Sequence, residues 1–137
     1  TTLDTRIKRS YIDRETILVI DTIGFIRNLP KNLFIAFKTT MNILNDVDLL
    51  LILYDLAAKD IGIQIESVEA QLSNILKSPK NKVIVFNKID KKMAAMRIES
   101  FKKRFSGAFF ISAKNNEGME NLKKRLKIFK EKVKYQL

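Results

Sequence analysis

The 137-residue chain contains no cysteine and no histidine, and only four glycines and two prolines. Without cysteine it can form neither disulfides nor thiolate metal sites. Without histidine, a zinc site would have to be built from carboxylates alone, and no imidazole can act as a catalytic base. The sequence therefore points away from zinc enzymes, disulfide-stabilised domains and histidine-based catalysis.

Long apolar runs are missing as well. The longest, residues 49 to 54, has the length of a strand and is flanked by Asp48 and Asp55, whereas a helix that crosses a bilayer needs roughly 20 apolar residues. Charges at Asp4 and Arg6, with no apolar stretch behind them, do not fit a signal peptide. We expect a cytoplasmic protein with no membrane span.

Acidic residues are few compared with basic ones. The chain has 15 Asp and Glu against 26 Lys and Arg, which gives a net charge of +11. The excess lies in residues 91–104 and 123–134. A basic surface favours solubility, and it also favours a polyanionic partner such as RNA, whose phosphates attract Lys and Arg. The charge alone leaves both interpretations open.

The apolar pattern predicts alternating strands and helices. Continuous apolar runs at residues 16–20, 49–54, 83–86 and 108–111 are typical of strands covered on both faces. Residues 5–12 alternate weakly and predict an exposed edge strand, antiparallel to the run that follows. Helical spacing of apolar residues, typical of helices with one buried face, occurs in four stretches: Leu33, Phe37, Met41 and Leu44; Ile65, Val68, Leu72, Ile75 and Leu76; Ile98, Phe101 and Phe105; Met119, Leu122, Leu126, Phe129 and Val133.

The order β-β-α-β-α-β-α-β-α predicts a three-layer α/β fold with a mostly parallel sheet and an antiparallel edge strand. In such folds ligands bind beyond the carboxyl ends of the strands. Three predicted strands end in short polar motifs: D-T-I-G at residues 21–24, N-K-I-D at residues 87–90 and S-A-K at residues 112–114. The first and third motifs are weak alone and N-K-I-D is moderately specific, but together they predict one site. The loop at residues 55–57 has no feature that indicates a function.

These motifs resemble the metal and γ-phosphate motif, the guanine-base motif and the base-supporting motif of translation-factor-class GTPases. Residues 21–30, D-T-I-G-F-I-R-N-L-P, are similar to the D-T-V-G-F-I-R-x-L-P signature of the HflX family of ribosome-associated GTPases. Residues 36–40, A-F-K-T-T, are similar to that family's A-F-x-x-T segment, and residues 1–4 look like the end of its first switch. The F-I-R-x-L-P stretch argues against the alternative of an Era-like ribosome-assembly GTPase.

The resemblance implies how a guanine base would be bound. Asp90 would accept hydrogen bonds from N1–H and from the exocyclic amine of guanine. Adenine has no such pair of donors and would leave the carboxylate unpaired, which selects GTP over ATP. Asn87 would brace the base and the neighbouring loops, and the stem of Lys88 would lie along the sugar and the base plane.

The third motif completes the predicted base site. The resemblance implies that Ala113 offers its backbone N–H to the guanine O6, while Ser112 and Lys114 shape the loop around it. For these residues, as for the other motifs, the resemblance implies a role in binding and none in bond breaking.

At the phosphates, the resemblance implies that Asp21 of the Asp21-Thr22 pair holds Mg²⁺ through water. Gly24 would place its N–H on the γ-phosphate, and Thr2 would be the switch threonine that senses Mg²⁺ and γ-phosphate, with Thr1 as an alternative. Phe25 stands where Ras-like enzymes carry a glutamine that orients the attacking water. We therefore expect slow hydrolysis unless a partner or another residue positions that water.

The phosphate-binding motif G-x-x-x-x-G-K-[ST] is not found in the chain, because no two of its four glycines have the required spacing. The resemblance implies that this loop, a central strand and a helix lie upstream of the switch threonine, the strand falling between the runs at 16–20 and 49–54. We therefore expect residues 1–137 to be a partial G domain, from the first switch to the C-terminal helix, within a longer protein. That strand's absence would leave sheet edges uncovered.

Two hypotheses for the function follow. In the first, the longer protein binds and hydrolyses GTP with Mg²⁺, and this controls its association with the large ribosomal subunit or ribosomal RNA; the chain alone would bind nucleotide weakly and would not hydrolyse it. In the second, the chain is a catalytically inactive G-domain remnant that serves as an RNA- or protein-binding module.

Overall fold

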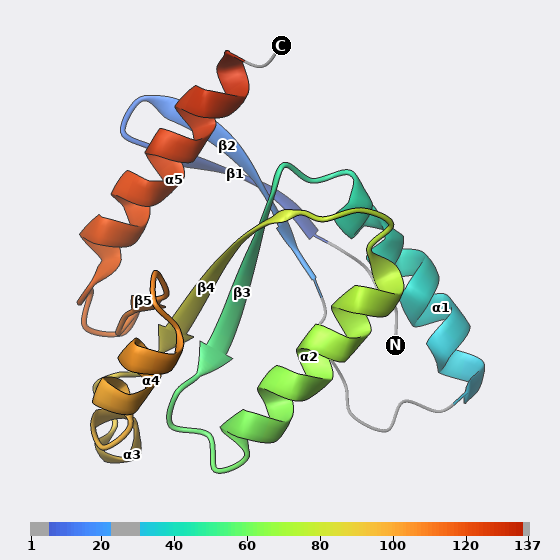
Figure 1. Ribbon diagram of the computed structural model, residues 1–137. Coiled ribbons are helices and arrows are strands. Elements are labelled where there is room, and N and C mark those ends of the chain that lie inside the picture. Colours follow the sequence, from blue (N-terminus) through green and yellow to red (C-terminus); the bar gives the residue numbers. More distant parts are fainter. Residues whose placement is uncertain (1–5, 23–30, 136–137) are drawn as a thin grey trace. The chain divides into compact units, whose positions relative to one another are not determined.

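The computed structural model describes residues 6–22 and 31–135, which divide into two compact units. One unit contains the residues up to Val47 together with Ser67–Pro79, and the other contains Asp48–Glu66 together with the residues from Lys80 onward. Figure 1 shows the elements of both. Within the described ranges no helix combines the length and the apolarity that crossing a bilayer requires.

The first unit begins with an antiparallel hairpin. Strands β1 (Arg6–Ile12) and β2 (Glu15–Asp21) pair along their full length, which confirms the expected antiparallel edge strand. The turn between them has Asp13 in the left-handed region, with a φ of 56°, a conformation that Asp adopts more readily than most residues. Most side chains of the hairpin are exposed, and Ile12 is buried.

Helix α1 (Lys31–Met41) follows and continues into the short 3-10 helix η1 (Asn42–Asn45), so the predicted helix ends one turn earlier than its apolar spacing indicates. The side chain of Asn45 joins η1 to the end of α2 (Ile61–Ile75): its Nδ2 donates to the carbonyl of Ile75 at 3.1 Å and its Oδ1 accepts the N–H of Lys77 at 2.9 Å. The apolar stripe predicted for α2 is its buried face.

The second unit contains the parallel sheet, with strands β3 (Leu49–Asp55), β4 (Asn81–Asn87) and β5 (Phe109–Phe110) in that order. Helices α3 (Lys92–Ala95) and α4 (Ile98–Arg104) lie between β4 and β5 in the chain, and α5 (Met119–Lys134) follows β5. Parallel strands joined by helical crossovers confirm the predicted α/β class. The sequence pattern did not predict α3, which spans only one turn.

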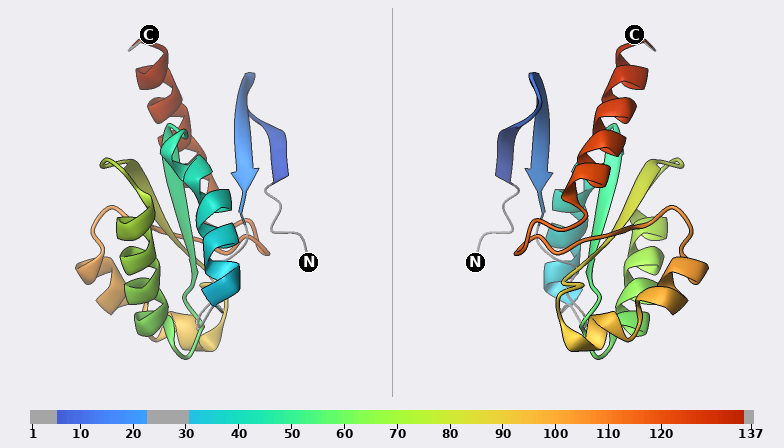
Figure 2. Two further views of the ribbon diagram at one scale, coloured as in Figure 1. Left: turned by 90° about the vertical axis from the view of Figure 1, so that its right-hand side faces the viewer. Right: turned by 90° about the vertical axis from the view of Figure 1, so that its left-hand side faces the viewer.

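The two faces of this sheet are covered by different helices, as the right-hand view of Figure 2 shows. On one face the ring of Phe86 contacts those of Phe101 and Phe105 from α4, both at centroid distances of 5.2 Å. On the other face Val83, Val85 and Ile111 form a core with Leu122 of α5. Because alternate residues of a strand point to opposite faces, β4 contributes to both cores, which gives the unit its three layers.

The outer edge of β3 is less well covered. Leu51 and Leu53 are 48% and 58% exposed, although Val83 and Val85, their partners on β4, are buried. Among the described residues β3 pairs with β4 alone, and β1 and β2 form a separate sheet. The sequence predicts one mostly parallel sheet with a missing strand between residues 16–20 and 49–54, and that missing strand stays a prediction.

Candidate functional site

Two of the three predicted motifs meet at the carboxyl ends of β4 and β5, the end toward which the arrowhead of β4 points in Figure 1. The side chain of Asn87 joins them, because its Oδ1 accepts the N–H of Lys88 at 2.8 Å and the N–H of Ala113 at 3.0 Å. Behind this contact, the N–H of Ile89 donates to the carbonyl of Ile111 at 3.2 Å. The loops after the two strands are therefore fixed to each other by side-chain and backbone bonds.

Lys88 occupies a strained position in the first of these loops. Its φ of 67° lies in the left-handed region, which costs a residue with a side chain about 1–2 kcal/mol. The hydrogen bond from its N–H to Asn87 and the turn bond from the N–H of Lys91 to its carbonyl, 3.0 Å long, hold this conformation. Such strain persists only where the surroundings fix the backbone, and it is common at binding sites.

Asp90 is exposed but oriented. One of its oxygens, Oδ1, accepts the hydroxyl of Ser112 at 2.7 Å, and the Ser112 side chain is fully buried and also accepts the N–H of Asn115 at 3.2 Å. The Ser112 hydrogen bond lowers the pKa of Asp90 from its ordinary value, and the charges of Lys91 and Lys114 lower it further. The carboxylate is therefore ionised at neutral pH.

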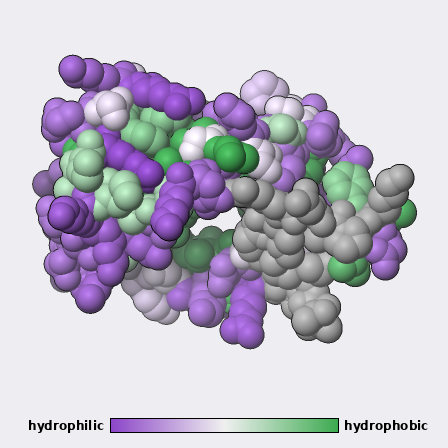
Figure 3. All heavy atoms as spheres, turned by 90° about the horizontal axis from the view of Figure 1, so that it is seen from below, coloured by the Kyte–Doolittle hydropathy of each residue, from purple (hydrophilic) through white to green (hydrophobic). Residues whose placement is uncertain are grey.

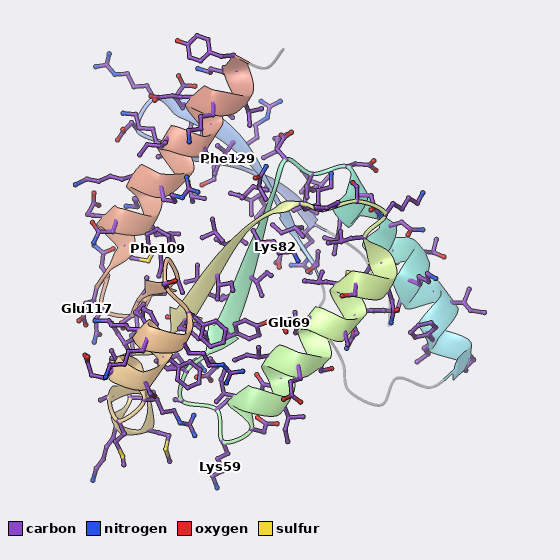
Figure 4. All side chains as sticks on the ribbon, in the orientation of Figure 1. Lys59, Glu69, Lys82, Phe109, Glu117 and Phe129 are labelled. Atoms are coloured by element: carbon purple, nitrogen blue, oxygen red, sulfur yellow. The ribbon has the colours of Figure 1, made fainter. Side chains whose placement is uncertain are left out.

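The loop that carries Ser112 is closed by its own backbone. Ser112 and Glu117 exchange two N–H···O bonds of 3.0 Å each, and Glu117 marks this loop in Figure 4. Gly118 follows at the start of α5 with a φ of 73°, and a Cβ there would meet the carbonyl oxygen of Phe110 at 2.4 Å. Only glycine fits this position, so Gly118 allows the loop of Ser112 to turn directly into α5, a role that no motif in the sequence indicates.

Asp55 at the end of β3 is a second residue that the sequence analysis missed. The parallel register places it opposite Asn87, and its Oδ2 accepts the ammonium of Lys88 at 2.8 Å. This pairing raises the pKa of Lys88, through the hydrogen bond first and the opposite charge second. No motif around residue 55 indicates this role, because the register between β3 and β4 cannot be read from the sequence.

The predicted phosphate residues are only partly described. Asp21 and Thr22 lie at the end of β2 in the first unit, where Asp21 is exposed. Thr2, Gly24 and Phe25 lie outside the described residues. Within the described ranges, residues 6–22 and 31–135, no three acidic side chains lie close enough together to hold a metal ion. The Mg²⁺ site predicted at Asp21 and Thr2 stays a prediction.

Hydrophilic residues predominate on much of the face shown in Figure 3, with hydrophobic residues between them, and Met93 and Met96 are among the exposed hydrophobic ones. Exposed Lys91 and Lys92 lie directly after the Asn87–Asp90 motif, and Lys114 lies in the facing loop. Positive charge around an ionised aspartate suits a ligand whose base bears hydrogen-bond donors and whose tail is anionic. A guanine nucleotide has both properties.

Comparisons with known proteins agree with this geometry. The chain is 32% identical to the GTPase HflX of Flavobacterium psychrophilum, over 91% of this chain and 35% of that protein. It is 37% identical to the GTPase HflX of Caldanaerobacter subterraneus, over 86% of this chain and 26% of that protein. The chain thus spans about a third or less of the length of these relatives. No protein-family model matches it.

Solved structures show the same fold. The crystal structure of SsGBP in complex with GDP superposes with a TM-score of 0.68 and 26% identity, over 96% of this chain and 43% of that chain. A mutation variant of SsGBP superposes with a TM-score of 0.71 and 23% identity, over 95% of this chain and 48% of that chain. The fold is that of a G domain. Within this class the chain is a relative of the HflX GTPases, which confirms the resemblance that residues 21–40 carry.

We predict that Ser112→Ala raises the pKa of Asp90 toward its ordinary value, because the hydroxyl that stabilises the carboxylate is lost. Since Asp90 has a lower pKa folded than unfolded, its ionisation stabilises the fold above the unfolded pKa, and this contribution fades as the pH falls through the folded pKa. The stability lost in Ser112→Ala is then larger at neutral pH than in acid. Carboxyl NMR titration of Asp90 measures the shift, with Ser106→Ala as the control; an unchanged pKa would contradict the role given to Ser112.

Proposed function

We propose that this chain supplies the guanine-binding half of a G domain, within a longer GTPase of the HflX type. The observation that carries the proposal is the oriented, ionised carboxylate of Asp90, held by buried Ser112. The carboxylate is exposed to solvent, so it can receive a ligand's donors, and guanine N1–H and N2–H₂ match a carboxylate edge. The HflX relatives and the GDP complex of SsGBP support a guanine nucleotide as the ligand.

The oxygen O6 of guanine requires a donor. Ala113, the residue expected to supply it, donates its N–H to Asn87 at 3.0 Å in the described structure. We propose that this N–H turns to O6 when the base binds, while Asn87 keeps the N–H of Lys88. The exchange replaces one hydrogen bond by another, so its net cost is small.

Hydrolysis belongs to the longer protein in this proposal. Mg²⁺, bound with GTP or GDP, would be held through water by Asp21 and by the switch threonine Thr2, and it would neutralise charge on the phosphates. Thr22 would lie beside this site and Gly24 would offer its N–H to the γ-phosphate. Because Phe25 cannot orient a water, we expect slow turnover without a partner, and none by residues 1–137 alone.

The partner we propose is the large ribosomal subunit or its RNA, contacted in the cytoplasm. The outward-facing residues of α5 include the neighbouring exposed pair Lys124 and Arg125, and its buried side is anchored by Leu122. The net charge of +11 supports a phosphate-rich surface as the partner. The same basic helix favours the second candidate, an RNA-binding module without turnover, so nucleotide dependence separates the two.

We predict that Asp90→Asn changes the base preference from guanine to xanthine. The amide would place an N–H₂ against the guanine amine, whereas xanthine presents a carbonyl there. GDP affinity should fall about 10- to 100-fold, the value of one or two hydrogen bonds to a charged group, and XDP should bind better than GDP. Fluorescent-nucleotide titration of the protein as its gene encodes it measures this, with ADP and the Asp48→Asn variant as controls. Equal binding of GDP and ADP by the unmutated protein would refute the proposed function.

For the partner, we predict that Lys124→Glu/Arg125→Glu reduces co-sedimentation with 50S subunits and makes its salt dependence shallower, because fewer counterions are released on binding. The control, Lys8→Glu/Arg9→Glu, removes the same charge from the exposed hairpin, so a general charge effect would appear in both variants. A non-hydrolysable GTP analogue should increase sedimentation relative to GDP. If co-sedimentation with 50S subunits is the same with the GTP analogue and with GDP, the second candidate, an RNA-binding module without turnover, is favoured.

A further inference from the structure

Asp55 and Lys88 form an ion pair across the ends of two neighbouring strands. Their charged atoms are 2.8 Å apart, and the side chains are 35% and 51% exposed, respectively. At such exposure an ion pair adds little to stability, typically about 0–1 kcal/mol. Stabilisation of the fold therefore does not explain why this pair lies among the loops of the proposed base site.

The carboxylate of Asp55 is oriented by a second bond. Its Oδ1 accepts the N–H of Ala57 at 2.9 Å, which leaves Oδ2 for Lys88. The loop after β3 is itself held by Arg97, whose Nη1 donates to the carbonyls of Leu56 at 2.9 Å and Ala58 at 2.5 Å. Because these bonds hold the loop after β3, the carboxylate of Asp55 has less freedom to move than that of an ordinary surface aspartate.

Lys88 is restrained at both ends. Its backbone is kept in the left-handed region by Asn87, and its ammonium is kept by Asp55. A free lysine side chain loses up to about 2 kcal/mol of rotamer entropy when it is immobilised. Here much of that loss is incurred before any ligand arrives, which is how preorganisation increases affinity.

We propose that Asp55 is a positioning residue of the base site, which holds the Lys88 side chain in the orientation that a guanine nucleotide uses. This inference rests on the proposed function, because it takes the loop of Lys88 as the base site. Asp55 acts through Lys88 and need not touch the ligand. The opposite arrangement, in which Asp55 withdraws Lys88 from the ligand, predicts tighter binding when Asp55 is neutralised.

The test is a double-mutant cycle on the protein as its gene encodes it. Asp55→Asn keeps an oxygen for the N–H of Ala57 but removes the negative charge, and Lys88→Met removes the ammonium but keeps an apolar stem. Fluorescent GDP is the probe, with its dissociation constant and its release rate measured at equal protein stability. Asp48→Asn, an exposed aspartate just before the other end of β3, is the matched control.

We expect Asp55→Asn to weaken GDP binding about two- to tenfold, the value of ordering one long side chain, chiefly through faster release. In the Lys88→Met background Asp55→Asn should have no further effect, and Asp48→Asn should have none in either background. A loss that is the same with and without Lys88, or tighter binding by Asp55→Asn, would overturn the positioning role.

The cycle also separates the two proposals. If the unmutated protein folds and binds no guanine nucleotide, the proposed function fails and the role of Asp55 fails with it. If it binds GDP selectively and Asp55→Asn binds equally well, only the role of Asp55 fails. Should Asp55→Asn not fold, Lys88→Arg and Lys88→Met serve instead: the arginine can still reach Asp55 and should retain more affinity than the methionine, and equal affinities would overturn the inference.

Discussion

The carboxamide oxygen of Asn87 makes the contact on which the rest of the base site depends. By accepting the N–H groups of Lys88 and Ala113 it joins the loops after β4 and β5, which are far apart in the sequence. The strands below are parallel and in fixed register, so the two loops arrive at the same edge of the sheet. Two further bonds join the same loops, from the N–H of Ile89 to the carbonyl of Ile111 and from the hydroxyl of Ser112 to Asp90, so Asp90 and Ala113 are held in a fixed arrangement.

Each further feature of the site adds rigidity to that arrangement. Ser112, fully buried, ties Asp90 to the β5 loop, and Gly118 lets that loop turn directly into α5. The hydrogen bond from Lys88 to Asp55 connects the loop after β4 to the end of β3. A carboxylate that is already oriented and ionised loses little freedom when a base binds. All of these residues of the proposed base site lie in the second compact unit.

Much of this was predictable from sequence because the relevant signals are local. The apolar runs and helical stripes predicted the α/β class, and N-K-I-D and S-A-K located the strand ends that the structure brings together. Asp55 and Gly118 could not be found in the same way: the first acts through the register of β3 and β4, and the second through a close approach to the backbone of Phe110. Both depend on contacts between segments distant in the chain. The apolar pattern likewise did not indicate that α1 ends at Met41 or that the short helix α3 forms.

In the proposed function, guanine recognition resides in the second unit and does not require the phosphates. The most direct measurement is a ¹H–¹⁵N NMR titration of the 137-residue chain with guanosine, which has a base and a sugar but no phosphate, and in parallel with adenosine. We expect guanosine to shift the amide signals of residues 87–91 and 112–115, that of Ala113 most strongly, and adenosine to leave them unchanged. Equal responses to the two nucleosides, or shifts that lie elsewhere, would contradict the proposal.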